Sequence, residues 1–364
     1  MPYLIVAAAS FAVALVSTPL VRRLATRAGW IDRPSDRKVH PSPTPTSGGL
    51  AIYLGVLAGV LVSRRLPFLA GLTAGSSDVQ AALLATVPLV VLGLVDDVKG
   101  VTPGTKLAGQ VLCAGLATLF GVQLLFFYVP GSGIVSLDPT LAIPLTVLWI
   151  VLMVNAVNLI DGLDGLAAGV VAIGAFAFLL YLRSAGGQPV ASSAALLSAA
   201  VLGGALGFLP WNFHPARIFM GDVGSMLLGL LLGIATVSGV GRNPYPPAGG
   251  DLAAIAIPVA LPLFVLFVPL ADVVFAIVRR VRRGTGLAHA DKEHIHHRLL
   301  DIGHSHRGAV LLIYLWSALI AGCALAVAFF EGWRAVSVVA LASLIVGIGV
   351  PVAALRARPR AKEA

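Results

Sequence analysis

The sequence predicts an all-α, polytopic integral membrane protein with about eleven transmembrane helices. Three observations support this prediction: 58% of the 364 residues are hydrophobic, only 11% are charged, and the mean hydropathy is +0.95. A soluble domain contains roughly a quarter charged residues. The apolar runs are continuous and close to the ~20 residues that a spanning helix needs. A membrane β-barrel would instead show short segments of alternating polarity.

Eleven apolar runs are assigned as spans, and no linker between them indicates a separate soluble domain. The runs cover residues 3–21, 48–63, 79–95, 106–126, 140–156, 166–182, 191–209, 224–239, 254–278, 309–329 and 335–355. Residues 1–355 are therefore predicted to form a single membrane-embedded domain, which a basic tail at 356–364 follows.

Lys and Arg residues are distributed unequally between the two sides of the predicted bundle. Of the 25 basic residues, 20 lie on the side that holds the loops 22–47, 96–106, 210–223 and 279–308 and the C-terminal tail. The positive-inside rule makes this side cytoplasmic, so the N-terminus is outside and the C-terminus inside. Because orientation accounts for the net charge of +9, we predict no nucleic-acid partner.

Acidic residues and histidines are concentrated on the same cytoplasmic side, including the segment 155–166. A transporter would place its functional polar groups near the bilayer midplane. The observed asymmetry favours an enzyme that acts at the membrane interface on a cytosolic substrate. A transporter and a non-catalytic scaffold remain the alternative classes, and the density of acids and histidines argues against the scaffold.

The first polar motif is Asp96-Asp97, at the end of the third predicted span. Consecutive helical residues point about 100° apart, so the two carboxylates do not share one face. Negative charge is also unfavourable at a helix C-terminus. A solvated helix end is the alternative to a functional pair. Lys106, which opens the next span, is either a phosphate contact or an ordinary cytoplasmic anchor.

The second motif places polar residues at intervals of three at the end of the fifth span. Its members are Asn155, Asn158, Asp161 and Asp164. On a helix this spacing keeps neighbours on one face. An Asp at the centre of a membrane helix costs roughly 2.5–3.5 kcal/mol on insertion scales, so such a stripe indicates function more than a hydrogen-bonded helix junction.

The third motif is Phe219-Met220-Gly221-Asp222, which leads into the eighth span. Asp222 alone would be interpreted as a helix N-cap. Gly221 and Gly224 flank it, and a helix N-terminus favours bound phosphate. We therefore expect a phosphate-binding helix start here.

The fourth motif is His289–Arg298, in a basic loop. Zinc binding is the main alternative, but the segment lacks a His-Glu-x-x-His pattern and nearby cysteines. His294 and His297 can share a helical face, with Arg298 beside them, and this arrangement suits a diphosphate. Two weaker candidates are the proline-rich lead-in to span two, which includes Lys38 and His40, and Asp272 in span nine.

Taken together, the motifs resemble those of the polyprenyl-phosphate N-acetylhexosamine-1-phosphate transferases. The resemblance rests on Asp96-Asp97, the run from Asn155 to Gly165, Phe219–Ser225 and the His294-x-His296-His297 pattern, in the family's order. The form of the histidine loop is similar to the undecaprenyl-phosphate N-acetylglucosamine-1-phosphate branch. The phospho-N-acetylmuramoyl-pentapeptide branch typically has three consecutive histidines there, and it remains the alternative.

The resemblance implies transfer of N-acetylglucosamine-1-phosphate from UDP-GlcNAc to undecaprenyl or another polyprenyl phosphate, with UMP as the second product. It also implies Mg²⁺, with Mn²⁺ as a substitute, and a location in the bacterial plasma membrane. A homodimer is left open as a further partner. Magnesium prefers one or two carboxylates plus substrate phosphates, and Asp161 and Asp222 are the expected ligands. The expected catalytic residues are Asp96, Asp97, Asp161, Asp164 and Asp222. The expected substrate-binding residues are Lys38, His40, Lys106, Asn155, Asn158, His294, His296, His297 and Arg298.

The two adjacent acids are expected to differ in role. A phosphate monoester has a second pKa of ~6, so the lipid acceptor is already mostly dianionic at neutral pH and gains little from a base. We therefore expect Asp97 to orient Lys106 or a metal-bound water. Asp96 is the better candidate for any proton transfer.

Overall fold

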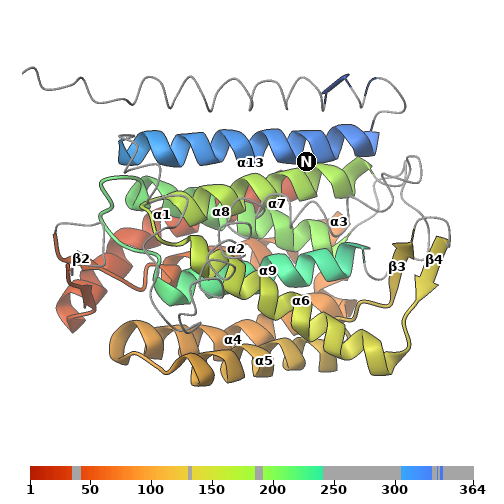
Figure 1. Ribbon diagram of the computed structural model, residues 1–364, viewed down its shortest axis with the longest axis horizontal. Helices are drawn as coiled ribbons and strands as arrows, with labels where there is room; N and C mark the ends of the chain where they lie inside the picture. Colours follow the sequence, from red (N-terminus) through yellow and green to blue (C-terminus); the bar gives the residue numbers. More distant parts are fainter. Residues whose placement is uncertain are drawn as a thin grey trace, which may run out of the picture.

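The computed structural model describes residues 1–34, 42–129, 133–184, 192–240 and 305–329, together with residues 334, 337 and 338. Within these ranges the protein is a bundle of helices that lie roughly parallel to one another (Figure 1). The helices are α1 (Pro2–Ala28), α2 (Gly49–Ser63), α3 (Pro67–Gly75), α4 (Ser77–Lys99), α5 (Pro103–Leu119), α6 (Pro139–Ile160), α7 (Leu166–Ser184), α8 (Ser193–Asn212), α9 (Gly221–Val240) and α13 (His306–Phe329).

Two small antiparallel strand pairs lie at opposite ends of the bundle (Figure 1). At one end, β1 (Ile31–Asp32) pairs with β2 (Thr44–Pro45). At the other end, β3 (Phe126–Val129) pairs with β4 (Gly133–Ser136). In the part of the chain that the structure describes, these two strand pairs are the elements that depart from the all-α prediction.

Seven helices in the described part of the chain are long and apolar enough to cross a bilayer: α1, α4, α6, α7, α8, α9 and α13. The protein is therefore a multi-pass membrane protein built from helices. The count of eleven spans and the sidedness of the termini stay predictions. The predicted span 254–278 lies outside the described residues, and so does most of 335–355.

The predicted span 106–126 is wrong at its C-terminal end. Helix α5 stops at Leu119, and Gly121 follows with a φ of 95°, a left-handed conformation that only glycine adopts without strain. The chain then enters β3, whose sequence Phe-Phe-Tyr-Val favours a strand. Helix α3 was also not predicted, because the polar residues after Ser63 interrupt the apolar pattern.

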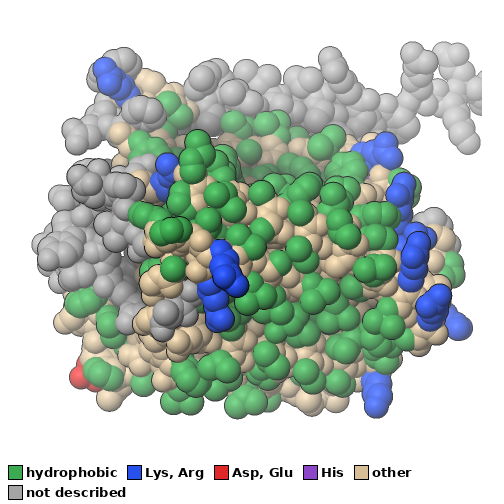
Figure 2. All heavy atoms as spheres, turned by 180° about the vertical axis from the view of Figure 1, so that it is seen from behind, with side chains coloured by type: hydrophobic (Ala, Val, Ile, Leu, Met, Phe, Trp, Pro, Cys, Tyr) green, Lys and Arg blue, Asp and Glu red, His purple; other side chains and the backbone are tan. Residues whose placement is uncertain are grey.

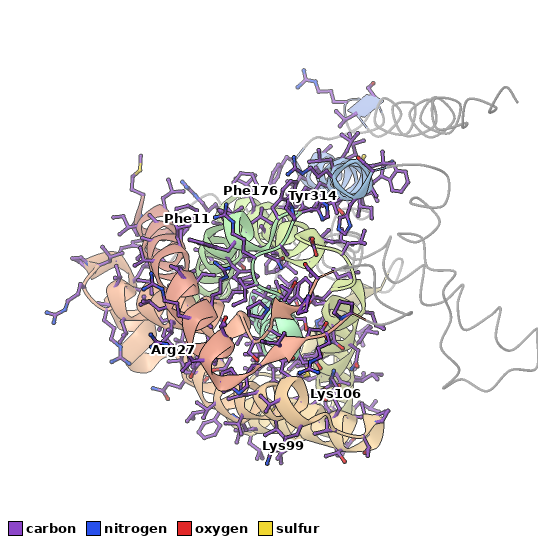
Figure 3. The ribbon with its side chains drawn as sticks, turned by 90° about the vertical axis from the view of Figure 1, so that its left-hand side faces the viewer. Phe11, Arg27, Lys99, Lys106, Phe176 and Tyr314 are labelled. Carbon is purple, nitrogen blue, oxygen red and sulfur yellow. The ribbon has the colours of Figure 1, made fainter. Side chains whose placement is uncertain are left out.

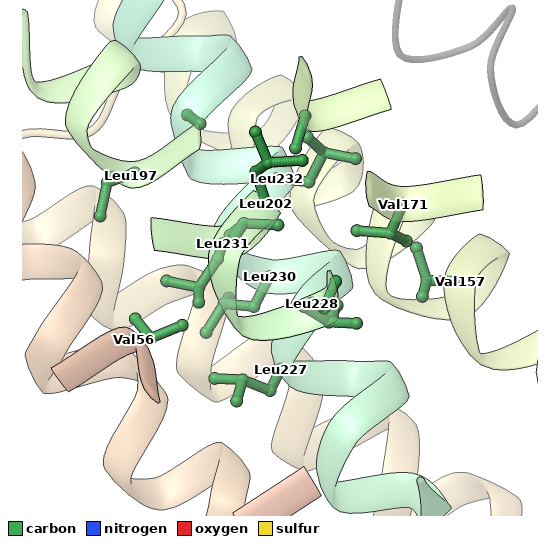
Figure 4. Close-up of a cluster of buried hydrophobic side chains, with 14 of the residues drawn as sticks. Val56, Val157, Val171, Leu197, Leu202, Leu227, Leu228, Leu230, Leu231 and Leu232 are labelled. Atoms are coloured by element: carbon green, nitrogen blue, oxygen red, sulfur yellow. The ribbon is translucent and has the colours of Figure 1, made fainter. Parts of the chain in front are cut away.

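Helix α9 lies at the centre of the bundle, where it packs against α2, α4, α6 and α8. Its leucines point in several directions and are all buried, as Figure 4 shows for Leu227, Leu228, Leu230 and Leu231. A helix that is apolar on all sides is typical of a buried position. Any residue at the start of α9 is therefore surrounded by the ends of other helices.

The outer surface of the bundle has the composition expected for contact with lipid. Helix α5 exposes Leu112 and Leu119, and α1 exposes Leu20 and Leu24. Figure 2 shows hydrophobic side chains across the middle of one face and a group of Lys and Arg side chains along one edge. Apolar side chains that would be unusual on a soluble protein are thus presented to the hydrocarbon core.

Glycines allow α2 and α4 to approach the start of α9 very closely. A Cβ atom on Gly49 would lie 2.1 Å from the main-chain nitrogen of Gly224, and one on Gly93 would lie 2.7 Å from the Cα of Val223. Small residues at membrane helix interfaces permit this kind of backbone contact. The ends of α2, α4 and α9 therefore meet without side chains between them.

We predict that Gly49→Ala lowers the unfolding temperature of the purified protein by several degrees. The added methyl group must push α2 away from α9, and overpacking of this kind typically costs about 1–3 kcal/mol. Differential scanning fluorimetry in detergent measures the shift. Gly115→Ala is the matched control, because a Cβ on Gly115 meets nothing within 4 Å. An equal loss in both variants would contradict the prediction.

Candidate active site

The carboxylate of Asp97 joins the end of α4 to the beginning of α9. One of its oxygens accepts a hydrogen bond from the main-chain N–H of Asp222 at 2.7 Å, and the other accepts from the hydroxyl of Ser47 at 2.9 Å. The first N–H groups of a helix have no partner within the helix, so an acceptor from elsewhere stabilises the helix start. Asp97 therefore caps α9 from a neighbouring helix.

Gly221 is the residue that makes room for this cap. Its φ is 69°, and a Cβ atom there would lie 2.3 Å from a carboxylate oxygen of Asp97. Any other residue would be strained and would displace the carboxylate. Asp97 thus occupies one N–H of this helix start, and the binding of a phosphate there stays a prediction.

Asp96 faces a different neighbour, the ammonium group of Lys106 on α5. The Lys106 nitrogen lies 3.0 Å from a carboxylate oxygen of Asp96 and 2.7 Å from one of Asp222. Of the two roles expected for Asp97, the orientation of Lys106 is thus wrong, and the orientation of a metal-bound water stays a prediction. The physical reason is the helical rotation between consecutive residues, which turns Asp96 toward α5 while Asp97 faces α9.

Asp222 turns its own carboxylate away from α9 toward α5 and α6. The oxygen that contacts Lys106 also accepts a hydrogen bond from the side-chain amide of Asn158 at 2.5 Å. The same amide donates to the hydroxyl of Ser225 at 2.9 Å. The side chains of Lys106, Asp96 and Asp222 remain partly open to solvent, so this cluster is accessible from the end of the bundle. Figure 3 looks at that end, where Lys106, Lys99 and Arg27 are labelled.

Asp161 lies beyond the end of α6, which stops at Ile160, so the predicted helical stripe ends before it. Burial of its carboxyl group raises the pKa of Asp161 to about 8, and repulsion between like charges adds to this effect. The carboxylates responsible belong to Asp222, Asp97 and Asp164. Burial and the neighbouring negative charges therefore both disfavour an ionised Asp161 in the absence of a cation.

A hard divalent cation fits this group of residues by charge and by ligand type. Carboxylate oxygens are the protein ligands that Mg²⁺ prefers, usually one or two of them, with the remaining positions left to water and phosphate. Asp161 and Asp222 are the carboxylates that would hold such an ion. Lys106 already neutralises part of the charge on Asp222, so Asp161 is the acid with the greater need of a cation.

A second cluster, which we call the His214 clamp, joins Asp164, His214 and His306. One carboxylate oxygen of Asp164 contacts Nδ1 of His214 at 2.7 Å and accepts the N–H of Ala216 at 3.0 Å. The N–H of Asp164 donates to Nε2 of His306 at 3.1 Å, and the two imidazole rings stack with centroids 4.1 Å apart.

The His214 clamp has donor atoms within 4.8 Å of one another, a separation that raises the question of a metal. However, the carboxylate oxygen of Asp164 already has two partners, and the lone pair of His306 Nε2 accepts the Asp164 N–H. We interpret the clamp as the anchor of the turn that carries Asp161.

Asn155 lies about one turn deeper in the bundle than Asn158. Its side-chain amide donates to Oε1 of Gln110 at 2.6 Å and to the main-chain oxygen of Val151 at 2.8 Å. The buried amide of Gln110 in turn contacts the sulfur of Met226 at 3.4 Å. The structure thus directs the Asn155 amide toward α5, where it holds helices together beneath the charged cluster.

Three participants, namely Ser47, His214 and His306, are not among the predicted site residues, although Ser47 lies in the proline-rich segment that was a weak candidate. Each comes from a different segment, so no local spacing linked it to an acid. Four histidine-loop residues and two lead-in residues that were predicted lie outside the described part of the chain. These are His294, His296, His297, Arg298, Lys38 and His40.

The fold and the cluster together define the class of protein. It is a multi-pass helical membrane protein whose acids, amides and lysine meet at one end of the bundle. The model of glycosyl transferase family 4 matches residues 79–240, which contain most of α4 and all of α5 through α9. The match includes the clustered residues Asp96, Lys106, Asn158, Asp161 and Asp222.

Similarity to curated proteins extends this match to most of the chain. Decaprenyl-phosphate N-acetylglucosaminephosphotransferase of Mycobacterium leprae is 43% identical over 94% of this chain and 88% of its own length. A probable undecaprenyl-phosphate N-acetylglucosaminyl 1-phosphate transferase of Bacillus subtilis is 40% identical over 83% of this chain and 78% of its own. The chain belongs to the family of polyprenyl-phosphate N-acetylhexosamine-1-phosphate transferases.

The sister branch of the family is matched at lower identity. Phospho-N-acetylmuramoyl-pentapeptide-transferase of Corynebacterium aurimucosum is 32% identical over 92% of this chain and 97% of its own length. Phospho-N-acetylmuramoyl-pentapeptide-transferase of Desulforudis audaxviator is 38% identical over 65% of this chain and 76% of its own length. Identity is therefore higher to the N-acetylglucosamine enzymes, in agreement with the form of the histidine loop.

The raised pKa of Asp161 predicts a pH dependence of stability in cation-free protein. The pKa of this carboxyl is ~3.9 in the unfolded chain and about 8 in the folded protein. Its contribution to the free energy of unfolding is therefore fully present below pH ~3.9 and is lost by the time the pH has risen through about 8. We expect the unfolding temperature, measured with a chelator present, to fall as the pH rises from about 4 to about 8 and to level off above that. Asp161→Asn should show a smaller fall, because its amide is never charged. Parallel curves for both proteins would contradict this assignment.

Proposed function

We propose that this protein transfers N-acetylglucosamine-1-phosphate from UDP-GlcNAc to a polyprenyl phosphate, which yields lipid-linked diphospho-N-acetylglucosamine and UMP. The observation that carries the proposal is the 43% identity over 94% of the chain to an enzyme named for this activity. The cluster of acids around Lys106 supports it, because phosphoryl transfer requires positioning and charge neutralisation more than covalent chemistry from the protein.

The reaction forms one bond and breaks one. An oxygen of the lipid phosphate attacks the phosphorus that carries the sugar, and the bond from that phosphorus to the bridging oxygen of UMP breaks. Both partners are anionic, so the protein must reduce their repulsion. In the part of the cluster that the structure describes, the cation is Lys106, which Asp96 and Asp222 hold in place. We assign Lys106 to binding the phosphates of the substrates.

Asp161 and Asp222 are our choices for Mg²⁺, with Mn²⁺ as a substitute. A divalent cation bound there supplies neutralisation of the phosphate oxygens and of the crowded carboxylates. Asn158 fixes the orientation of Asp222 through its side-chain amide. Asp96 is held by Lys106 and by the N–H of Val101 at 2.8 Å, so we assign it to positioning charge instead of removing a proton.

We further place the site at the cytoplasmic face of a bacterial plasma membrane. The lipid acceptor is amphiphilic and the nucleotide sugar is soluble, so a site at the end of the helices can meet both. The basic bias of the loops at this end selects the cytoplasmic side.

The direct test is an assay of purified protein with polyprenyl phosphate and radiolabelled UDP-GlcNAc. We expect lipid-linked radioactivity and UMP in equal amounts. In competition, the muramoyl-pentapeptide nucleotide should compete poorly. Preferred turnover of the pentapeptide donor would move the protein to the sister branch, and no turnover of either donor would refute the proposed activity.

We predict that Asp222→Asn lowers kcat by more than the 10–100-fold typical of residues that only support metal ligands. The substitution keeps the shape of the side chain but removes the charge that contacts Lys106 and would hold Mg²⁺. Initial rates over a magnesium titration measure the effect.

The control for this variant is Asp138→Asn. Asp138 is exposed and caps α6 at the opposite end of that helix, and Asn is an equally good N-cap. We expect near-normal rates. If Asp222→Asn retained the activity and magnesium dependence of this control, Asp222 would not be a ligand.

A further inference from the structure

Ser47 has a backbone conformation that its residue type disfavours. Its φ is 65°, and it is the one non-glycine residue with positive φ among those that the structure describes. The side chain is completely buried at the start of α2. A residue with a Cβ atom adopts this left-handed conformation at a cost in free energy, which persists only where the surroundings enforce it.

Main-chain hydrogen bonds on both sides of Ser47 enforce this conformation. The N–H of Phe219 donates to the oxygen of Pro45 at 2.8 Å, and the N–H of Gly48 donates to the oxygen of Phe219 at 2.9 Å. The N–H of Gly49 donates to the oxygen of Met220 at 2.9 Å. The chain around Ser47 is therefore fastened to the segment that leads directly into α9.

The hydroxyl of Ser47 donates to Asp97 at 2.9 Å. A glycine would adopt the same φ without strain, and both following residues are glycines. What serine adds at this position is the hydroxyl, and the partner of that hydroxyl is the carboxylate that caps α9. The second oxygen of that carboxylate binds the N–H of Asp222.

We propose that Ser47 is a positioning residue for the transfer reaction. By fixing one oxygen of Asp97, it fixes the other oxygen on the N–H of Asp222. The carboxylate of Asp222 is thereby held toward Lys106 and Asn158. Ser47 itself touches no reacting atom in this scheme, and the inference rests on the proposed function.

The test compares two variants that both lack the hydroxyl. Ser47→Ala retains the strained left-handed residue, whereas Ser47→Gly relieves the strain, so the glycine variant should unfold at the higher temperature of the two. If the hydroxyl positions Asp97, both variants lose kcat to a similar extent, at least about 10-fold, with KM for both substrates unchanged.

A double-mutant cycle then asks whether Ser47 acts through Asp97. We expect Ser47→Ala to change kcat by less than 3-fold in an Asp97→Asn background, because residues of one hydrogen-bonded network are not additive. Ser63→Ala is the matched control, since Ser63 is equally buried at the other end of α2 and its hydroxyl donates to the main-chain oxygen of Val60 in its own helix. It should retain wild-type kcat.

Three results would overturn the inference. These are wild-type kcat in Ser47→Gly, activity losses that follow the unfolding temperatures of the two variants, or fully additive losses in the cycle. All of them require that the wild-type protein turns over UDP-GlcNAc or the pentapeptide donor. Absence of turnover in the wild type refutes the proposed function instead, so the two failures are distinguishable.

Discussion

The hydrogen bond between the carboxylate of Asp97 and the N–H of Asp222 ties α4 to the start of α9, and the arrangement of the site depends on it. In a bilayer there is little hydrophobic force between helices, so close backbone packing and polar contacts set their positions. Gly49 and Gly93 permit the close packing at this junction, and Gly221 makes room for the carboxylate. The contacts of the Asp222 carboxylate with Lys106 and Asn158 therefore start from an α9 that is fixed in this way.

Crowded negative charge is the second feature that shapes the site. Asp96 and Asp222 share the Lys106 ammonium, whereas Asp161 lies among carboxylates without a described basic partner of that kind. Such a site has a strong electrostatic preference for cations, and a nucleotide diphosphate could approach it only with its charge compensated. The position at the end of apolar helices reconciles a lipid acceptor with a soluble donor.

The adjacent acids illustrate how far motif reasoning reaches. The sequence identified Asp96 and Asp97 as a functional pair, yet it assigned Lys106 to the wrong member, because a motif does not contain the rotation of each residue about its helix. The regular spacing from Asn155 to Asp164 suggested one continuous stripe. The structure instead ends α6 at Ile160 and uses His214 and His306 to hold the following turn.

The sequence by itself determined the class of protein, the approximate limits of most described spans and the acids that gather at one face. These properties depend on local hydrophobicity and on the cost of burying charge in lipid, both of which are written along the chain. Only the tertiary structure decided which acid faces Lys106, which one caps α9, and why a strained Ser47 is present. Those outcomes depend on contacts between residues up to 125 positions apart, which no local pattern specifies.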